Sequence, residues 1–204
     1  MKVLTKFMMS AADPQRFPSP GAPEVAFIGR SNVGKSSLIN SLVGNKIAKT
    51  SNTPGRTQTI NFFEIRWPGR PRPDIVFADL PGYGYARVPR ELTQEWPKFI
   101  EPYLSQRLNL ALCLCLVDAN VPPQQSDAQM VEWLRTTNRP FMVVATKADR
   151  VGTRLVASLN ALKKELGIET IVAYSSKSGA GRDELWRAIR EAGERHHDAQ
   201  PEAS

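Results

Sequence analysis

Residues 29–36 form the segment that most restricts the folds open to this chain. They read Gly-Arg-Ser-Asn-Val-Gly-Lys-Ser, which matches the P-loop pattern of Gly, any four residues and Gly-Lys-Ser. The apolar run 25–28 before them predicts a buried strand, and residues 37–43 after them carry apolar side chains at helical spacing. A strand, a glycine loop and a helix N-terminus together direct backbone N–H groups and the helix dipole towards phosphate oxygens. We therefore expect this segment to bind a nucleoside triphosphate.

The residues expected to contact the phosphates are Gly29, Arg30, Ser31, Asn32, Val33, Gly34, Lys35 and Ser36. Among them, Lys35 would reach the β- and γ-phosphates, and the hydroxyl of Ser36 would ligate Mg²⁺. A glycine turn before a helix also occurs in proteins that bind no nucleotide, so the flanking strand and helix are what favour the P-loop. The loop by itself leaves the base of the nucleotide undecided.

Apolar runs alternate with helical patterns along the rest of the chain. The runs predict strands over 60–67, 75–78, 110–117, 141–145 and 170–174. Helices are expected over 90–105 (despite Pro97 and Pro102), 126–136 with Ser126 as N-cap, 155–166 ending at Gly167, and 183–195. Fully apolar strands between helices predict an α/β fold of the P-loop NTPase class, with a Ras-like, mostly parallel sheet and helices on both faces.

Three regions are expected along the chain. Residues 1–22, in part rich in proline and alanine, predict an extended segment that packs on or leads into the domain. Residues 23–195 form the nucleotide-binding domain, and 196–204 form a flexible polar tail. The adjacent His196 and His197 in that tail are interpreted as solvated side chains rather than metal ligands, because no carboxylate or thiol partner set accompanies them.

Composition narrows the partners and the compartment. Lys and Arg number 27 against 20 Asp and Glu, a net charge of +7, which favours an anionic partner such as RNA over charge that is merely solvated. Cys113 and Cys115 share one face of a predicted strand and are interpreted as small buried apolar residues in a reduced, cytoplasmic setting. No apolar segment approaches about 18 residues, so we expect no membrane span.

Polar motifs follow three of the predicted strands. Asp79-Leu80-Pro81-Gly82 follows the strand 75–78, where Asp79 can hold Mg²⁺ through water and the Gly82 N–H can meet the γ-phosphate. Thr146-Lys147-Ala148-Asp149 follows 141–145, and Ser175-Ser176-Lys177 follows 170–174. Ligands bind at the carboxyl ends of the strands in such sheets, so all three motifs are expected to contact the nucleotide.

The second motif selects guanine. It is a Thr variant of Asn-Lys-x-Asp, in which Asp149 accepts hydrogen bonds from N1–H and the 2-amino group of guanine. Lys147 would pack its stem along the base plane, and a backbone N–H of 175–177 would meet O6. Adenine offers no such donor pair, so ATP would leave a carboxylate unpaired. Each short motif alone is also typical of a solvated turn, but four of them in this order, each after a strand, predict a guanine-nucleotide site.

Two further strings complete a family pattern. With Thr53-Pro54-Gly55-Arg56-Thr57-Gln58 and the longer Asp79-Leu80-Pro81-Gly82-Tyr83-Gly84-Tyr85-Ala86, the chain resembles the EngB family over nearly its whole length. These are small bacterial translation-factor-like GTPases of the TrmE-Era-EngA-EngB-septin-like superfamily. The resemblance implies a Mg²⁺-dependent GTP switch in assembly of the large (50S) ribosomal subunit, needed for normal cell division and septation. It also implies a cytoplasmic protein, expected to be monomeric, whose partners are rRNA and ribosomal proteins.

The resemblance also assigns a first switch. Its GTP contacts would be Gly55, Arg56, Thr57, Gln58 and Thr59. Thr57 is the expected Mg²⁺ ligand and Thr59 the runner-up, while a loop threonine that only caps a turn is the alternative. Segments 45–59 and 82–90 would order with GTP and relax with GDP. Lys35, Thr57 and Gly82 are the residues expected to support catalysis.

The residue after Gly82 departs from the Ras-like pattern. Ras-like proteins carry a glutamine there that orients the attacking water, whereas this chain carries Tyr83. We therefore expect slow intrinsic hydrolysis, stimulated by the ribosome, by potassium, or by both. Asn32 occupies the P-loop position of an asparagine ligand in cation-dependent relatives, and K⁺ there could neutralise transition-state charge. The alternative is that Asn32 only stabilises the loop turn.

Two other functions stay open at this stage. One is a P-loop ATPase or nucleotide kinase, which the guanine motif at 146–149 disfavours. The other is a GTP-dependent RNA- or protein-binding module with negligible intrinsic turnover, which Tyr83 keeps open.

Overall fold

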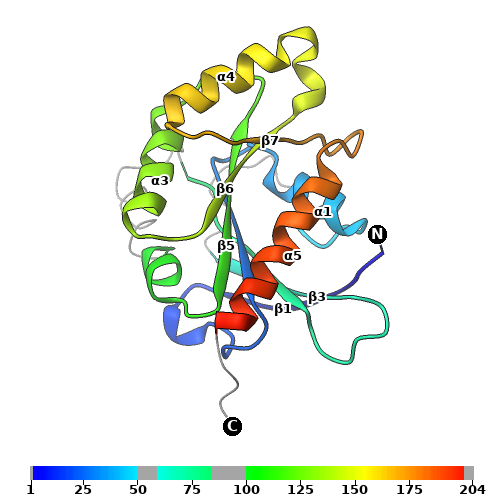
Figure 1. The fold of residues 1–204 in the computed structure, drawn as a ribbon. Coiled ribbons are helices and arrows are strands. Elements are labelled where there is room, and N and C mark those ends of the chain that lie inside the picture. Colours follow the sequence, from blue (N-terminus) through cyan, green and yellow to red (C-terminus); the bar gives the residue numbers. More distant parts are fainter. Residues whose placement is uncertain (1, 50–58, 84–99, 200–204) are drawn as a thin grey trace.

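The computed structural model describes residues 2–49, 59–83 and 100–199 of the 204-residue chain. Within these ranges the strands form one seven-stranded sheet in the order β1-β3-β4-β2-β5-β6-β7 (Figure 1). The strands are β1 (Leu4–Ala11), β2 (Glu24–Gly29), β3 (Ile60–Arg66), β4 (Ile75–Asp79), β5 (Leu110–Asp118), β6 (Phe141–Thr146) and β7 (Val172–Ala173). The α-helices are α1 (Lys35–Val43), α3 (Gln125–Thr136), α4 (Leu155–Leu166) and α5 (Arg182–Ala199), and residues 100–106 are also helical. Short 3₁₀ turns occupy η1 (Pro14–Arg16), η2 (Ala148–Arg150) and η3 (Gly152–Arg154).

Among the strands described, the sheet is parallel from β4 through β2, β5 and β6 to β7, while β1 pairs antiparallel with β3 and β3 pairs antiparallel with β4. This arrangement confirms the mostly parallel sheet predicted from the alternation of strands and helices. The register places the carboxyl ends of the parallel strands along one edge of the sheet: Gly29 pairs with Leu116, and Asp118 pairs with Thr146. The loops that follow β2, β4, β5, β6 and β7 therefore leave the sheet on the same side.

Helices cover both faces of this sheet (Figure 1). In β2, Val25 and Phe27 pack with apolar side chains of α1 and α5, whereas Ala26 and Ile28 pack with those of α3, α4 and the helical residues 100–106. Successive strand residues point to opposite faces, so a strand with a helix layer on each side must be apolar throughout. All nine residues of β5 are buried, including Cys113 and Cys115. Burial of these continuous apolar runs is what makes the sheet the centre of the domain.

The N-terminal strand β1 was not predicted. The sequence pattern over 1–22 indicates only an extended segment, but residues 4–11 hydrogen-bond to β3 and extend the sheet at its antiparallel edge. The register shifts between Phe7 and Met9, which breaks the alternation of apolar and polar side chains by which a strand is recognised. Phe7 lies edge-on against Phe63 of β3, with 5.7 Å between ring centroids.

Several predicted boundaries move. Helix α5 continues to Ala199, into the segment predicted as a polar tail, and β7 contains only Val172 and Ala173 of the predicted 170–174. The N-cap of α3 is Gln124, so the prediction of Ser126 as N-cap is wrong and Ser126 lies inside the helix. Gly167 does end α4, in the left-handed conformation at φ 61°. Of the predicted helix 90–105, residues 90–99 lie outside the described ranges.

A buried polar cluster ties the start of the domain to the helical residues 100–106. Glu24 is 1% exposed, and its carboxylate accepts hydrogen bonds from Arg107 at 2.6 Å and from the Tyr103 hydroxyl at 2.8 Å. The Arg107 guanidinium also donates to the Pro18 carbonyl at 2.6 Å. A buried charge needs such partners because an isolated carboxylate is strongly disfavoured away from water. Among the helices described, none is both long and apolar enough to cross a lipid bilayer.

Candidate nucleotide-binding site

The loop after β2 has the backbone geometry of a phosphate cradle. Gly34 lies at φ 104° and caps α1, a conformation that residues with a side chain rarely adopt. A Cβ on Gly29 would lie 2.9 Å from the Leu116 carbonyl oxygen, so only glycine fits against β5 there. Among the described residues, no side chain caps the first turn of α1. The N–H groups of that turn can therefore bind an anion.

Lys35, expected to contact the phosphates, and Asp79, expected to hold Mg²⁺, contact each other in this structure. Lys35, the first residue of α1, forms an ion pair with Asp79, the last residue of β4. Their side chains are only 12% and 6% exposed. Both charges are screened from bulk water, so the contact is stronger than a surface pair would be. Ser36 follows Lys35 in the same turn, which leaves a hydroxyl and a carboxylate suited to Mg²⁺ on neighbouring elements.

Gly82 packs directly against this loop. The Ser31 N–H donates to the Tyr83 carbonyl at 3.0 Å and the Tyr83 N–H donates to the Gly29 carbonyl at 3.3 Å, which extends the pairing of β4 and β2 by one bridge. A Cβ on Gly82 would lie 3.0 Å from Ser31 N and Cα. These contacts hold the Asp79-Leu80-Pro81-Gly82 motif against the P-loop, and two residues of the motif, Leu80 and Pro81, are buried.

The threonine of the guanine motif connects three segments. The Thr146 hydroxyl lies 2.5 Å from the Val33 carbonyl oxygen and 3.0 Å from that of Val117. Thr146 therefore joins β6 to the P-loop and to β5. A short hydroxyl suffices for this role at the position where the common motif has asparagine.

Lys147 joins the base motif to the phosphate loop. It lies in the left-handed conformation at φ 58°, and its ammonium donates to the Asn32 carbonyl at 2.8 Å and to Asp118 at 2.6 Å. Sequence reasoning missed Asp118, although an acidic residue that ends the nine-residue apolar strand β5 is a signal that could have identified it. Asn32 is also left-handed, at φ 61°, and its side chain is exposed.

Asp149 and Ser175 come together from two different loops. The Ser175 hydroxyl donates to the Asp149 carboxylate at 2.7 Å, and this hydrogen bond is the main cause that lowers the pKa of Asp149 below its usual range. Ser175 itself is buried, whereas Asp149, Ser176 and Lys177 are exposed. The Ala148 N–H donates to the Tyr174 carbonyl at 3.1 Å, which ties the two loops together. Asp149 is therefore an ionised acceptor that faces solvent, as a guanine contact requires.

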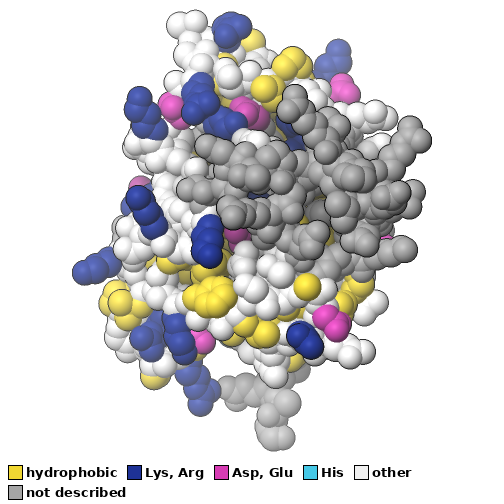
Figure 2. All heavy atoms as spheres, turned by 180° about the vertical axis from the view of Figure 1, so that it is seen from behind, with side chains coloured by type: hydrophobic (Ala, Val, Ile, Leu, Met, Phe, Trp, Pro, Cys, Tyr) yellow, Lys and Arg dark blue, Asp and Glu magenta, His cyan; other side chains and the backbone are white. Residues whose placement is uncertain are grey.

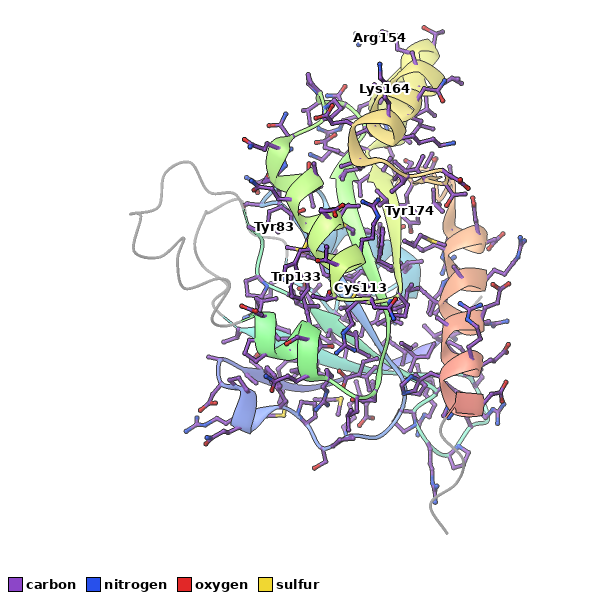
Figure 3. All side chains as sticks on the ribbon, turned by 60° about the vertical axis from the view of Figure 1, so that its left-hand side comes forward. Tyr83, Cys113, Trp133, Arg154, Lys164 and Tyr174 are labelled. Carbon is purple, nitrogen blue, oxygen red and sulfur yellow. The ribbon has the colours of Figure 1, made fainter. Side chains whose placement is uncertain are left out.

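Tyr83 is turned away from solvent towards helix α3 (Figure 3). Its side chain is buried, and its hydroxyl donates to the Asp127 carboxylate at 2.9 Å. The other oxygen of Asp127 accepts from Arg30 of the P-loop at 3.2 Å. Sequence reasoning missed Asp127, which carries no motif and lies 97 residues from Arg30.

The first switch cannot be placed in the same way. Gly55, Arg56, Thr57 and Gln58 lie outside the described residues. Thr59, the runner-up Mg²⁺ ligand, is described as a partly exposed residue directly before β3.

Comparison with known proteins fits this site. Residues 24–147 match the family described as 50S ribosome-binding GTPase. The chain is 65% identical over 193 residues to a probable GTP-binding protein EngB from Koribacter versatilis (strain Ellin345), which covers 94% of this chain and 95% of that protein. This chain belongs to the EngB family of GTP-binding proteins.

Solved structures agree with the EngB assignment. The crystal structure of a probable GTP-binding protein EngB superposes with a TM-score of 0.69 at 25% identity, over 84% of this chain and 99% of that one. The crystal structure of Era with MgGDPNP and nucleotides of 16S ribosomal RNA gives the same TM-score and identity over 89% of this chain and 58% of that one. The P-loop GTPase fold and the resemblance to EngB are both confirmed, and an ATPase or nucleotide kinase is set aside.

Proposed function

We propose that this EngB protein is a Mg²⁺-dependent GTP switch and slow GTPase that acts in assembly of the 50S ribosomal subunit, and that normal cell division and septation need it. The observation that carries the proposal is the meeting of two half-sites at one edge of the sheet. The Lys35–Asp79 pair lies at the P-loop, and Asp149 with Ser175 would form the base side. Lys147 links the two halves through the Asn32 carbonyl.

In this proposal Ser36 would hold Mg²⁺ directly and Asp79 would hold it through water, and the metal would supply positive charge at the β- and γ-phosphates. Nucleotide binding would exchange the Lys35–Asp79 pair, so that Lys35 holds phosphate oxygens instead. The Gly82 N–H would contact the γ-phosphate, and Thr57 would join Mg²⁺ only when that phosphate is present. The complex of Era with MgGDPNP supports the metal for a protein of the same fold.

Hydrolysis is proposed to be slow because Tyr83 replaces the water-orienting glutamine and its hydroxyl bonds to Asp127. Two stimulators are proposed, the 50S subunit and K⁺ held at Asn32. Steady-state GTP hydrolysis compared in KCl and NaCl at equal ionic strength tests the second. A faster rate in KCl that Asn32→Ala abolishes is expected, and equal rates in the two salts would rule potassium out.

The proposed partner is the 50S particle, through rRNA and ribosomal proteins, in the cytoplasm and as a monomer. The family description and the net charge of +7 support an RNA-rich partner. Figure 2 shows Lys and Arg side chains spread over one described face, with fewer Asp and Glu between them. Co-sedimentation with purified 50S subunits in GTP, GDP or no nucleotide tests this partner. We expect the protein to co-sediment with 50S subunits in GTP, and the Lys35→Ala variant not to do so. Equal co-sedimentation in all three conditions would contradict a switch.

A second function is favoured by the bond between Tyr83 and Asp127. With this side chain held by α3, the protein could act as a GTP-dependent binding module in which turnover matters little. The two functions differ in their response to the ribosome. A rise in hydrolysis of about tenfold or more on addition of 50S subunits supports the switch, and no rise with intact binding supports the module.

A further inference from the structure

The carboxylate of Asp127 joins three segments that surround the phosphate cradle. Asp127 lies in the first turn of α3 and is 2% exposed. One carboxylate oxygen accepts from the Tyr83 hydroxyl at 2.9 Å, and the other accepts from Arg30 Nε at 3.2 Å. Arg30 follows the first glycine of the P-loop, and Tyr83 follows the glycine of Asp79-Leu80-Pro81-Gly82. One buried group of α3 therefore contacts both the P-loop, through Arg30, and the residue after Gly82, through Tyr83.

The backbone contacts of Tyr83 with the P-loop also restrict the position of Gly82, the residue before it. The Tyr83 N–H and carbonyl both pair with the P-loop, at 3.3 Å to Gly29 and 3.0 Å to Ser31. Gly82, one residue earlier, packs closely on the loop, because a Cβ there would lie 3.0 Å from Ser31 N and Cα. With the Tyr83 ring anchored by its hydroxyl and its backbone anchored on the loop, the Gly82 N–H has little freedom to move from the cradle.

We propose that Asp127 is a positioning residue for the γ-phosphate: by holding Tyr83 and Arg30, it keeps the Gly82 N–H at the P-loop and so favours GTP over GDP. This proposal rests on the proposed contact between the Gly82 N–H and the γ-phosphate. Burial raises the pKa of Asp127, and the counter-charge of Arg30 and the hydrogen bond from Tyr83 oppose that rise. Its place on α3 also lets that helix respond to the nucleotide.

The test compares nucleotide affinities in three variants. Asp127→Asn removes the charge at nearly constant shape, Tyr83→Phe removes only the hydroxyl, and Glu132→Gln changes an exposed acid of the same helix. Affinities for GDP and for a non-hydrolysable GTP analogue are measured by calorimetry, and each variant's melting temperature is recorded. A lost hydrogen bond to a charged group corresponds to roughly tenfold in affinity.

For Asp127→Asn we expect about a tenfold loss of affinity for the GTP analogue, with GDP affinity changed less than about twofold. Tyr83→Phe should shift the ratio in the same direction, and Glu132→Gln should leave it unchanged. Equal weakening of both nucleotides, or no change in either, would show that Asp127 only stabilises the fold and would overturn the proposal. If Asp127→Asn does not fold, Tyr83→Phe decides, because it keeps the ring and the Arg30–Asp127 pair.

A fourth variant separates failure of this proposal from failure of the contact on which it rests. Gly82→Ala places a Cβ against Ser31 and should itself lower the preference for the GTP analogue. If Gly82→Ala shifts the ratio and Asp127→Asn does not, the positioning role is wrong while the γ-phosphate contact stands. If Gly82→Ala leaves the ratio unchanged, both the contact and the positioning role are wrong.

Discussion

At the scale of single residues, three charged groups of the candidate nucleotide site are each held by a neighbouring side chain. Lys35 pairs with Asp79, Lys147 pairs with Asp118, and Asp149 accepts from Ser175. The contacts of Lys147 and Asp149 reduce the number of rotamers that these side chains must give up when a ligand binds, whereas the Lys35–Asp79 pair would be exchanged on binding. Asp149, the carboxylate proposed to contact the base, differs from Asp79 and Asp118 in being exposed, so it could meet guanine without first breaking a buried pair.

Replacing that carboxylate should change the base that is bound. In Asp149→Asn the side-chain amide presents a donor where guanine also presents donors, so GTP affinity should fall roughly 10- to 100-fold and affinity for the xanthine nucleotide should rise. Competition binding with GTP and XTP measures both. Asp183→Asn, an exposed aspartate in the first turn of α5, is the matched control. Retained GTP selectivity in Asp149→Asn would refute the assigned base contact.

The two cysteines should be inert in the native protein. Burial raises the pKa of Cys113 to about 12, so at about pH 8 only about one thiol in ten thousand is ionised. Burial also raises the pKa of Cys115. We expect iodoacetamide to modify neither residue over an hour in native buffer and both within minutes in denaturant, as read by mass spectrometry. Rapid native modification would mean that β5 is not buried as described.

At the scale of elements, the turn from β7 into α5 depends on its glycines. Gly179 and Gly181 both lie at φ 79°. A Cβ on Gly181 would collide with the Ala173 carbonyl oxygen, whereas nothing lies near a Cβ on Gly179. The Ser175 N–H donates to the Ala180 carbonyl within the same turn. The turn that positions Ser175 beside Asp149 thus depends on close approach of backbone at Gly181.

Because Gly179 and Gly181 share the same φ, alanine variants of the two separate the cost of backbone strain from the cost of the steric clash at Gly181. Gly179→Ala should destabilise the protein by about 1–2 kcal/mol, the cost of a left-handed non-glycine residue. Gly181→Ala should cost this amount plus the collision with backbone, for a total of about 3 kcal/mol or more. Urea unfolding at constant m-value gives both numbers. Equal costs for the two variants would show that the β7–α5 turn moves to accommodate the methyl group.

At the scale of the whole molecule, a second polar cluster holds the N-terminal segment. Glu24, Tyr103 and Arg107 connect the start of β2 with the helical residues 100–106, and Arg107 also reaches the Pro18 carbonyl. The nucleotide site lies at the other end of β2, after Gly29. Stability and nucleotide binding should therefore be separable in this protein.

Arg107→Met tests that separation. It leaves the Glu24 carboxylate buried without its cation, so the free energy of unfolding should fall by about 3–5 kcal/mol. Arg70→Met breaks the surface ion pair between Arg70, whose side chain is 67% exposed, and Asp74. The free energy of unfolding should fall by less than about 1 kcal/mol. Urea unfolding measures both, and calorimetry should show GDP affinity within about twofold of the wild type for each. A loss below about 1 kcal/mol for Arg107→Met would contradict the burial of this pair.

The parts of the fold that could be predicted are those whose pattern lies within a short continuous stretch of sequence. The continuous apolar runs of β2, β4, β5 and β6 and the motifs that follow β2, β4 and β6 are local patterns, so their existence and order could be predicted. Strand β1 could not, because a register shift between Phe7 and Met9 breaks its alternation. The last turn of α5, residues 196–199, was missed because its polar composition is typical of a tail as well as of an exposed helix end.

The sequence by itself predicted that this chain binds a guanine nucleotide, since each pattern expected to contact phosphate or base is a short peptide at a strand end. Only the tertiary structure decided what holds those peptides. Asp118 and Asp127 lie far along the chain from the P-loop, and parallel crossovers bring them to Lys147, Arg30 and Tyr83. Such contacts between distant segments leave no periodic trace in one sequence. The sequence therefore showed that Tyr83 stands where Ras-like proteins have a glutamine, but it did not predict the hydrogen bond from Tyr83 to Asp127 of α3.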